Sequence, residues 1–174
     1  MNIREATVED CRDLAHIQVD SYRRAYAGIF PQAYLDAFTY EEQEQDWRDL
    51  LTSEMQDILL VAEIQPGKLV GYALGRPGIA EVAPFDSEMV ALHVRREFQG
   101  QGVGQELVKA IAQALKRQGC TSLIVWVLER NPARGFYKRL GGQLLDVRKD
   151  VQEGVFEVAY GWPTLESLFE KGVE

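Results

Sequence analysis

Residues 94–107 read VRREFQGQGVGQEL, and this segment decides how the chain folds. Three glycines, Gly100, Gly102 and Gly104, follow an apolar run that ends at Val94, and an amphipathic helical pattern comes next. Glycine lets the backbone approach an anion closely, and the first free N–H groups of a helix point at that anion along the positive end of the helix dipole. The segment therefore predicts a strand, a phosphate-binding loop and a helix N-terminus in succession.

Two common glycine loops do not fit this segment. A P-loop carries Lys and then Ser or Thr after its last glycine, but residue 105 is Gln. A dinucleotide-binding loop needs G-x-G-x-x-G in the first strand–helix turn, and Gln105 stands where its third glycine belongs. The spacing that does fit is Gln-x-x-Gly-x-Gly, formed by Gln99, Gly102 and Gly104.

The remaining sequence predicts a mixed sheet with helices around it. Helical spacing of apolar residues predicts helices over residues 7–20, 41–55, 105–117 and 131–142, and a broken helix over 21–38. Apolar alternation and turn residues predict strands over residues 2–5, 58–64, 69–75, 88–94, 121–128, 143–149 and 154–161. Within 88–94, a period of two puts Glu88 on the face of Leu92 and Val94, and His93 on the opposite face.

Composition limits the classes of protein. The chain has 174 residues, of which 46% are hydrophobic, and we expect a single domain over residues 1–174. No apolar run reaches the roughly 20 residues of a membrane span, and MNIREATVED lacks the core of a signal peptide, so a cytoplasmic protein is expected. Cys11 and Cys120 match no metal or redox spacing, so no metal is expected.

The distribution of charge suggests what the protein binds. The net charge of −8 argues against nucleic acid as a partner. Residues 36–57 hold eight acidic residues against Arg48 alone, whereas residues 95–117 and 129–149 are basic. This pattern predicts a polyanionic cofactor on one side and a cationic substrate on the other.

Two segments together resemble the GCN5-related N-acetyltransferase (GNAT) superfamily. ALHVRREFQGQGVGQELV, residues 91–108, is similar to the family's strand, pyrophosphate loop and helix. NPARGFYKRLGG, residues 131–142, resembles its later helix, because Ala133, Phe136 and Tyr137 keep the Ala-x-x-Phe-Tyr spacing. The resemblance implies an α/β (α+β) fold, with a mixed, mostly antiparallel sheet of about six or seven strands and about four helices.

The resemblance also implies transfer of an acetyl group from acetyl-CoA, as co-substrate, to a primary amine by direct attack. A backbone N–H of Leu92 or His93 would stabilise the charge that develops on the thioester oxygen. Arg95, Arg96 and Arg134 are candidates for the phosphates. The cofactor-binding residues implied are Leu92, His93, Val94, Gln99, Gly100, Gln101, Gly102, Val103, Gly104 and Asn131.

Two residues are candidates for proton transfer. Tyr137 matches the family position of the acid that protonates the departing thiolate, although it is also suited to packing the helix on the sheet. Glu88 is the candidate base, because the family often places a glutamate on this strand. His93 has the better intrinsic pKa, but a histidine beside a loop is more often structural.

The acceptor is expected to be a small-molecule or peptide amine, and an aromatic segment is expected to lie against it. Five aromatic residues recur every four residues within the broken helix: Tyr22, Tyr26, Phe30, Tyr34 and Phe38. The tyrosines Tyr22, Tyr26 and Tyr34 are candidate walls of an acceptor site as well as candidate core residues. The alternative function is a non-catalytic acyl-CoA-binding or regulatory module of the same fold. A longer acyl group, and a homodimer through the C-terminal strands or a closed monomer, stay open.

Overall fold

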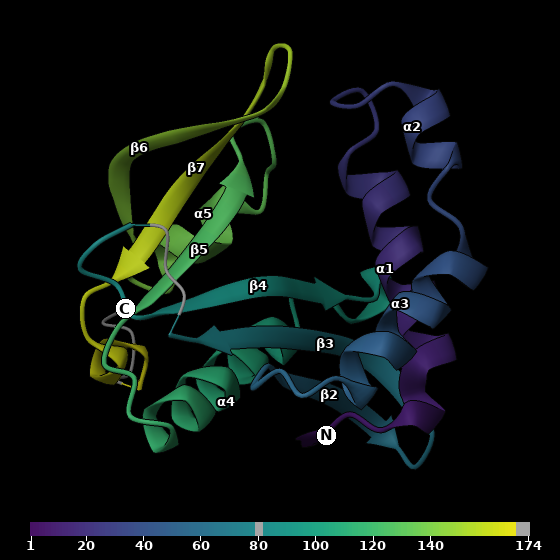
Figure 1. Ribbon diagram of the computed structural model, residues 1–174, viewed down its shortest axis with the longest axis horizontal. Coiled ribbons are helices and arrows are strands. Elements are labelled where there is room, and N and C mark those ends of the chain that lie inside the picture. The colour runs from purple at the N-terminus through teal and green to yellow at the C-terminus, as the bar shows by residue number, and fades with distance from the viewer. Residues whose placement is uncertain (79–81, 170–174) are drawn as a thin grey trace.

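The computed structural model describes residues 1–78 and 82–169, which form one sheet with helices on both faces (Figure 1). Among the described strands the order is β1-β2-β3-β4-β5-β7-β6, and only β4 and β5 pair in parallel. The strands are β1 (Asn2–Glu5), β2 (Ile58–Gln65), β3 (Lys68–Pro77), β4 (Ser87–Val94), β5 (Leu123–Leu128), β6 (Gln143–Gln152) and β7 (Val155–Trp162). The prediction of a mixed, mostly antiparallel sheet is confirmed.

Five α-helices form among the described residues, close to the number expected, and the predicted break within residues 21–38 is present. The aromatic segment after residue 20 divides, because Gly28 has a positive φ of 75° and Pro31 begins a separate short helix. The helices are α1 (Cys11–Ala25), α2 (Gln32–Asp36), α3 (Tyr40–Thr52), α4 (Val103–Arg117) and α5 (Arg134–Arg139).

Helix α4 covers one face of the sheet. Leu107, Ile111 and Leu115 repeat at helical spacing and are fully buried in the core beneath β3 and β4. Each such side chain contributes about 1.5–3 kcal/mol by leaving water. The helix lies so close that a Cβ on Gly75 of β3 would stand 2.8 Å from Ile111 Cγ2, so this strand position has room only for glycine.

Helices α1 and α3 cover the other face. Leu14 and Ile17 of α1 and Trp47 of α3 are buried against β2 and β3 in a second cluster. Trp47 meets Tyr72 of β3 edge to face, with ring centres 5.1 Å apart. Residues of β2 alternate between the two clusters, with Leu60 and Ala62 in the first and Leu59 and Val61 in the second, so the clusters lie on opposite faces of the sheet (Figure 1).

Strand β4 contains a bulge. Leu74 of β3 pairs with Ala91, and its neighbour Gly75 pairs with Met89, so Val90 is an extra residue without a partner on β3. A bulge of this kind shifts the alternation of side chains by one residue and turns the inserted residue outward. Val90 is accordingly 39% exposed, although it lies in the middle of a central strand.

The bulge overturns one prediction. Leu92 and Val94 pack toward α4, whereas His93 lies beside Tyr72 on the α1 side. Because the bulge lies between them, Glu88 shares the face of His93 and not that of Leu92 and Val94. The predicted face of Glu88 is therefore wrong, since a strict period of two assumes an unbroken ladder, whereas His93 does lie opposite Leu92 and Val94 as predicted.

Strands β4 and β5 are joined at one end only. Their register contains the single pair Glu88–Ile124, and beyond it the strands diverge like the arms of a V (Figure 1). Asp86 fixes the joined end, since its carboxylate accepts hydrogen bonds from the backbone N–H groups and hydroxyls of Thr121 and Ser122 at 2.8–3.1 Å. The other end of the V is left open.

The C-terminal strands build the second arm of this V. β6 pairs with β7, which is the hairpin predicted for residues 143–149 and 154–161. β7 pairs with β5 on its other side. Helix α5 is attached to this arm by Trp162, whose Nε1 donates to the carbonyl oxygen of Leu140 at 2.9 Å. Gly142 permits this contact, because a Cβ there would stand 2.8 Å from Trp162 Cζ2.

Candidate active site

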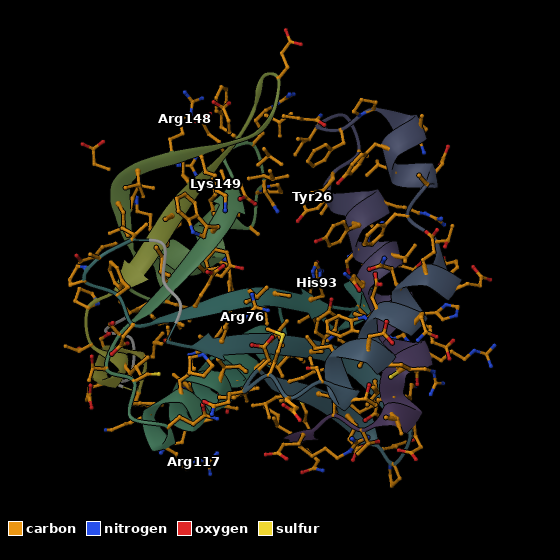
Figure 2. The ribbon with its side chains drawn as sticks, in the orientation of Figure 1. Tyr26, Arg76, His93, Arg117, Arg148 and Lys149 are labelled. Carbon is orange, nitrogen blue, oxygen red and sulfur yellow. The ribbon has the colours of Figure 1, made fainter. Side chains whose placement is uncertain are left out.

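The divergence of β4 and β5 opens a cleft of about 790 Å³. Small-molecule sites typically measure about 300–1,000 Å³. Its walls come from α1, β4, the glycine loop, β5, α5 and β7. Figure 2 shows Tyr26 and Lys149 on opposite sides of this region, with His93 of β4 below Tyr26. The cleft therefore lies where segments far apart in the sequence meet.

The glycine loop follows β4 at the open end of the V. Gly100 and Gly102 have φ angles of 73° and 84°, a region that favours glycine, and the backbone turns there into α4. Gln99, Gly100 and Gly104 line the cleft. A Cβ on Gly104 would stand 3.3 Å from Phe136 Cζ, so glycine also lets α4 and α5 approach each other. The first N–H groups of α4 are thus presented beside the cleft.

Three other predicted loop residues support the loop instead of lining the cleft. Gln101 Nε2 donates to the carbonyl oxygen of Glu97 at 2.7 Å, and Gly102 provides the left-handed turn before the helix. The side chain of Val103 is buried in the core beneath the sheet. An anion at this loop would therefore be bound by the backbone N–H groups of these residues and not by their side chains.

The backbone of β4 faces the cleft at alternate residues. Arg95 N donates to Val70 of β3 at 2.8 Å, so alternation turns the backbone groups of His93 to β3 and those of Leu92 and Val94 to the opening. Gln99 Nε2 donates to the carbonyl oxygen of Val94 at 2.9 Å, which agrees with that direction. Leu92 N–H is the donor in the middle of the exposed strand edge.

Tyr137 of α5 lies in the cleft wall at the core boundary. Its side chain is 7% exposed, and burial raises the pKa of its hydroxyl well above the ordinary tyrosine value. Tyr26 of α1 also lines the cleft, and burial raises the pKa of its hydroxyl as well. The cleft is thus bordered by tyrosines from both α5 and α1.

Two of the three tyrosines predicted for the acceptor wall line the cleft. Tyr22 and Tyr26 lie next to each other on α1, with ring centres 4.7 Å apart. Tyr34 does not line it; its ring stacks on Phe30 at 4.8 Å and is 52% exposed. The break at Gly28 turns α2 away from the continuous helical face that the sequence pattern assumed.

Glu88 is not among the described residues that line the cleft. It lies at the joined end of the V, opposite Arg76 of β3, and the two side chains interact electrostatically. Arg76 also donates to both carboxylate oxygens of Asp57, at 2.9 and 2.7 Å. Glu88 therefore belongs to a charged group at the edge of the site.

His93 lines the cleft as a neutral ring. It lies between Tyr22 and Tyr72, with ring centres 5.4 and 5.3 Å away. Burial, helped by the positive charge of Arg24, lowers the pKa of His93 to about 4. An imidazole with so low a pKa is a weak base near neutral pH.

Only some of the candidate phosphate-binding side chains face the cleft. Arg96 lines the cleft, whereas Arg95 donates to the carbonyl oxygen of Leu69 at 2.9 Å and approaches Asp13. Asn131 lines the cleft, and its Oδ1 accepts from Ala133 N at 2.9 Å, which holds the turn into α5.

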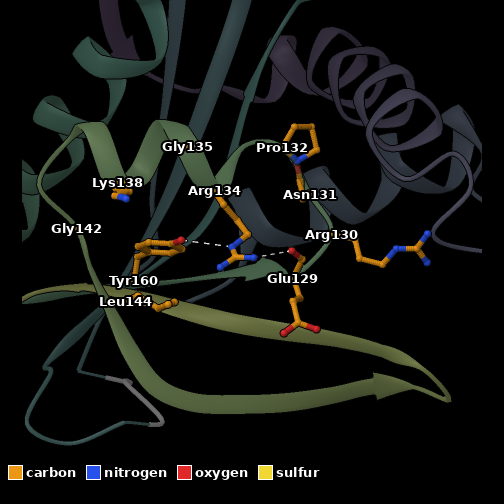
Figure 3. Close-up of a pocket in the computed structure, with 10 residues that line it drawn as sticks. All are labelled: Glu129, Arg130, Asn131, Pro132, Arg134, Gly135, Lys138, Gly142, Leu144 and Tyr160. Carbon is orange, nitrogen blue, oxygen red and sulfur yellow. Dashed lines mark hydrogen bonds between the residues drawn. The ribbon is translucent and has the colours of Figure 1, made fainter.

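Arg134 points to a second cavity of about 490 Å³, on the far side of α5 (Figure 3). There it donates to the hydroxyl of Tyr160 at 3.3 Å and to the carbonyl oxygen of Glu129 at 2.9 Å. Arg134 therefore fastens α5 to the sheet, and Arg96 is the member of the predicted set of arginines that faces the cleft.

Sequence reasoning missed several polar or aromatic residues of the cleft, among them Arg24, Trp126, Arg139 and Glu157. Glu157 is the one carboxylate among the described lining residues. It reaches the cleft because β7 pairs beside β5, an order that no local pattern in the sequence reveals. Trp126 was expected only as part of a buried strand.

The described residues contain no group of three or more His, Cys, Asp or Glu placed to hold a metal ion. A search of the same residues finds no helix that is both long and apolar enough to span a membrane. The acidic segment 36–57, which the structure describes in full, contributes no residue to the cleft lining. The charge of that segment is thus separated from the site.

Comparisons with known proteins match this architecture. The profile of the Acetyltransferase (GNAT) family matches residues 18–142. The chain is 34% identical to the uncharacterized N-acetyltransferase YuaI of Bacillus subtilis (strain 168), over 97% of this chain and 96% of that protein. It is 21% identical to the spermidine N(1)-acetyltransferase of Thermoplasma acidophilum, over 92% of this chain and 98% of that one.

Solved structures show the same fold. The PaiA N-acetyltransferase of Thermoplasma acidophilum, in complex with coenzyme A, superposes with a TM-score of 0.71 at 19% identity. The match covers 92% of this chain and 98% of that protein. At such low identity the likeness concerns the fold alone.

Proposed function

The chain belongs to the acetyltransferase (GNAT) family, and on that premise we propose that it transfers an acetyl group from acetyl-CoA to a primary amine. The observation that carries this proposal is the V between β4 and β5. It places an unpaired strand edge, a glycine loop at a helix N-terminus and a buried tyrosine around one cleft. We assign this proposed activity to a single domain over residues 1–174.

The residues of the cleft fit acetyl-CoA. The edge of β4 at Leu92 and Val94 offers backbone N–H and C=O groups to the two amides of a pantetheine arm, as an added strand would. The loop N–H groups and the start of α4 suit a pyrophosphate, and Arg96 and Arg139 add positive charge to the lining. A coenzyme A complex is known for a structure of this fold.

The chemistry assigned to the site is direct attack. The amine nitrogen bonds to the carbonyl carbon of the thioester, the C–S bond breaks, and Tyr137 donates a proton to the departing sulfur. Leu92 N–H is the donor aimed at the oxygen on which negative charge develops. Removing one such donor typically costs about 3–4 kcal/mol of transition-state stabilisation. Deprotonation of the amine needs a base, and Glu88 is the candidate implied by the family.

We still expect a cationic acceptor, but the argument for it no longer rests on the acidic segment 36–57. The acidic segment 36–57 does not line the cleft, as far as the described residues show. Tyr22 and Tyr26 provide an aromatic wall, and the relatives named for spermidine show that an amine acceptor occurs in similar proteins. The proposed acceptor is therefore a primary amine with a positive charge and an apolar or aliphatic body.

The test measures free thiol after the purified protein is mixed with acetyl-CoA and a panel of amines. The panel contains spermidine, 2-phenylethylamine, a lysine-containing peptide and an anionic amino acid, and the wild type is run beside Glu88→Gln. Amine-dependent thiol release is expected, with the cationic amines preferred. A loss of that release in Glu88→Gln, with acetyl-CoA binding unchanged, is the result that supports Glu88 as the base.

Two results would overturn parts of the proposal. Acetyl-CoA binding by calorimetry, without amine-dependent release from any member of the panel, would favour the non-catalytic acyl-CoA-binding module. Acetylation of the anionic amine alone would remove the argument for a cationic acceptor. A substrate screen with longer acyl-CoA esters, run in the same format, measures the preference for acyl length.

A further inference from the structure

Charged groups are unevenly placed in the cleft. Among the described lining residues, Arg24, Arg96 and Arg139 are cationic and Glu157 is the one anion. Arg96 follows β4 at the glycine loop, which is the end assigned to the cofactor phosphates. Glu157 projects from β7, on the arm of the V that faces α1. An acceptor entering the cleft therefore meets one carboxylate.

The strand register shows which way Glu157 points. It pairs with Leu128 of β5, and side chains that pair directly lie on the same face of a sheet. Leu128 packs against Phe30 and Leu35, so this face is the one turned toward the α1–α2 region. Burial raises the pKa of Tyr26, and the charge of Glu157 raises it further, which places the carboxylate within electrostatic reach of that tyrosine.

The same face already holds an ammonium group. Lys149 of β6 pairs with Glu157 from the other side of β7. Its Nζ lies 5.5 Å from the centre of the Trp126 ring, within the distance of a cation–π contact. Figure 2 shows Lys149 across the region from Tyr26. An aromatic face and a carboxylate on neighbouring strands are the two groups that recognise an ammonium ion best.

We propose that Glu157 and Trp126 form the acceptor-binding site for a primary ammonium group, and that Lys149 occupies this position when no acceptor is bound. This inference rests on the proposed function, because it names the part of that site that selects the acceptor. Glu157 acts by binding: it pairs with the positive charge of the acceptor, and Trp126 covers the same charge with its ring. Lys149 competes with the acceptor for both groups.

The competition predicts opposite effects for two neighbouring substitutions. Glu157→Gln keeps the shape of the side chain and removes the charge, so it weakens the binding of a cationic amine. A hydrogen bond to a charged group contributes about 1.5–3 kcal/mol, which corresponds to roughly a tenfold or greater change in Kd. Lys149→Met removes the competing ammonium and tightens binding several-fold. A purely structural role for the pair would make both variants worse.

The experiment is titration calorimetry on the protein saturated with coenzyme A. The probes are 2-phenylethylamine and spermidine, and 2-phenylethanol serves as a neutral probe of the same shape as the first. The variants are Glu157→Gln, Lys149→Met and, as a matched control outside the cleft, Glu153→Gln in the turn between β6 and β7. Coenzyme A affinity and circular dichroism are measured for each variant to confirm that it folds.

The expected result is weaker amine binding by Glu157→Gln, tighter binding by Lys149→Met, and wild-type binding by Glu153→Gln, with 2-phenylethanol unaffected throughout. Wild-type affinity in Glu157→Gln, weaker binding in Lys149→Met, or no binding of either amine to the wild type would overturn the proposal. Thiol release from acetyl-CoA is measured on the same variants, prepared without coenzyme A. Charge-dependent amine binding without thiol release would reject the proposed function and leave the ammonium site standing.

Discussion

The hydroxyl of Tyr137 is the group whose removal tests the acid directly. Tyr137→Phe is expected to lower kcat at pH 7 by about 100-fold or more, the usual range for loss of general acid–base catalysis, with little change in the KM for acetyl-CoA. Because burial raises the pKa of Tyr137, the hydroxyl stays protonated at neutral and mildly alkaline pH. Steady-state kinetics between pH 7 and pH 9 measure both constants.

Tyr160→Phe is the control for that substitution. This substitution removes the same hydroxyl group from a tyrosine on the far side of α5. The Tyr160 hydroxyl accepts a hydrogen bond from Arg134 in the second cavity. It is expected to cost stability and to leave kcat near the wild-type value. Equal losses of kcat in the two variants would assign the effect of Tyr137 to packing.

His93 supplies a prediction about stability. Its pKa is lowered to about 4 in the folded protein by burial, helped by Arg24 of α1, and is about 6.5 in an unfolded chain. Between these pH values the unfolded state binds a proton that the native state does not, so the free energy of unfolding falls as the pH falls. The loss amounts to about 3 kcal/mol at most over this window.

His93→Gln is expected to flatten the dependence between pH 6.5 and pH 4, as measured by urea unfolding. Tyr22 and Tyr72, which flank the ring, do not titrate in that range. His16→Gln is the control, and it should retain the steep dependence because His93 is still present. An equally steep curve for His93→Gln would contradict the low pKa.

Single residues also show where sequence reasoning succeeds. Tyr137, Gln99 and Gly104 were identified because each stands at fixed spacing within one contiguous segment, and the structure brings all three to the cleft. Glu157 had no such signal. It lies 20 residues beyond Tyr137 in a strand with no motif, and only the pairing of β7 beside β5 brings it to the site.

The joined end of β4 and β5 depends on Asp86. Burial acts to raise the pKa of this carboxyl, but hydrogen bonds from Thr121 and Ser122 outweigh it, and the pKa is lowered. Asp86→Asn removes acceptors that these donors need, so it should lower the free energy of unfolding at pH 7 by about 1–3 kcal/mol. Urea unfolding measures the difference.

The sign of the pH effect follows from the lowered pKa. The contribution of Asp86 is present above the unfolded pKa of about 3.9 and is lost as the pH falls through the lower folded value. The gap between wild type and Asp86→Asn should therefore narrow below about pH 4. Asp146→Asn, an exposed site on β6, is the control. A gap that stays constant down to pH 3 would show that the charge of Asp86 is not involved.

The element that sequence could not resolve is the bulge in β4. The run from Glu88 to Val94 was correctly predicted as a strand, because its composition and position fix that much. The inserted residue, Val90, is decided by the fit of β3 against β4, where Gly75 and Leu74 pair with residues two apart. No local preference for a bulge distinguishes valine from its neighbours, so the sequence pattern put Glu88 on the wrong face.

Over the whole chain, the order of elements was predictable and the shape of the cleft was not. Helical and strand periods are local, and they gave the succession of helices, hairpins and the final strand–helix–strand unit in the correct order. The cleft is a gap in a sheet, created where β4 and β5 stop pairing after one residue pair. Which residues face such a gap depends on strands that are distant in sequence, as Glu157 and Trp126 illustrate.

The same gap predicts how the whole molecule responds to its coenzyme. A ligand at 100 times its Kd stabilises the native state by about 2.7 kcal/mol, and this protects every amide that exchanges by global unfolding to the same extent. The N–H groups of Leu92 and Val94 face the opening, so in the free protein they exchange without global unfolding. Arg95 N–H already donates to Val70 at 2.8 Å. Coenzyme A should therefore slow exchange at Leu92 and Val94 by a larger factor than at Arg95, as hydrogen exchange followed by NMR measures. Equal protection at all three amides would mean that the pantetheine arm does not pair with β4, and the coenzyme would have to bind through the loop alone.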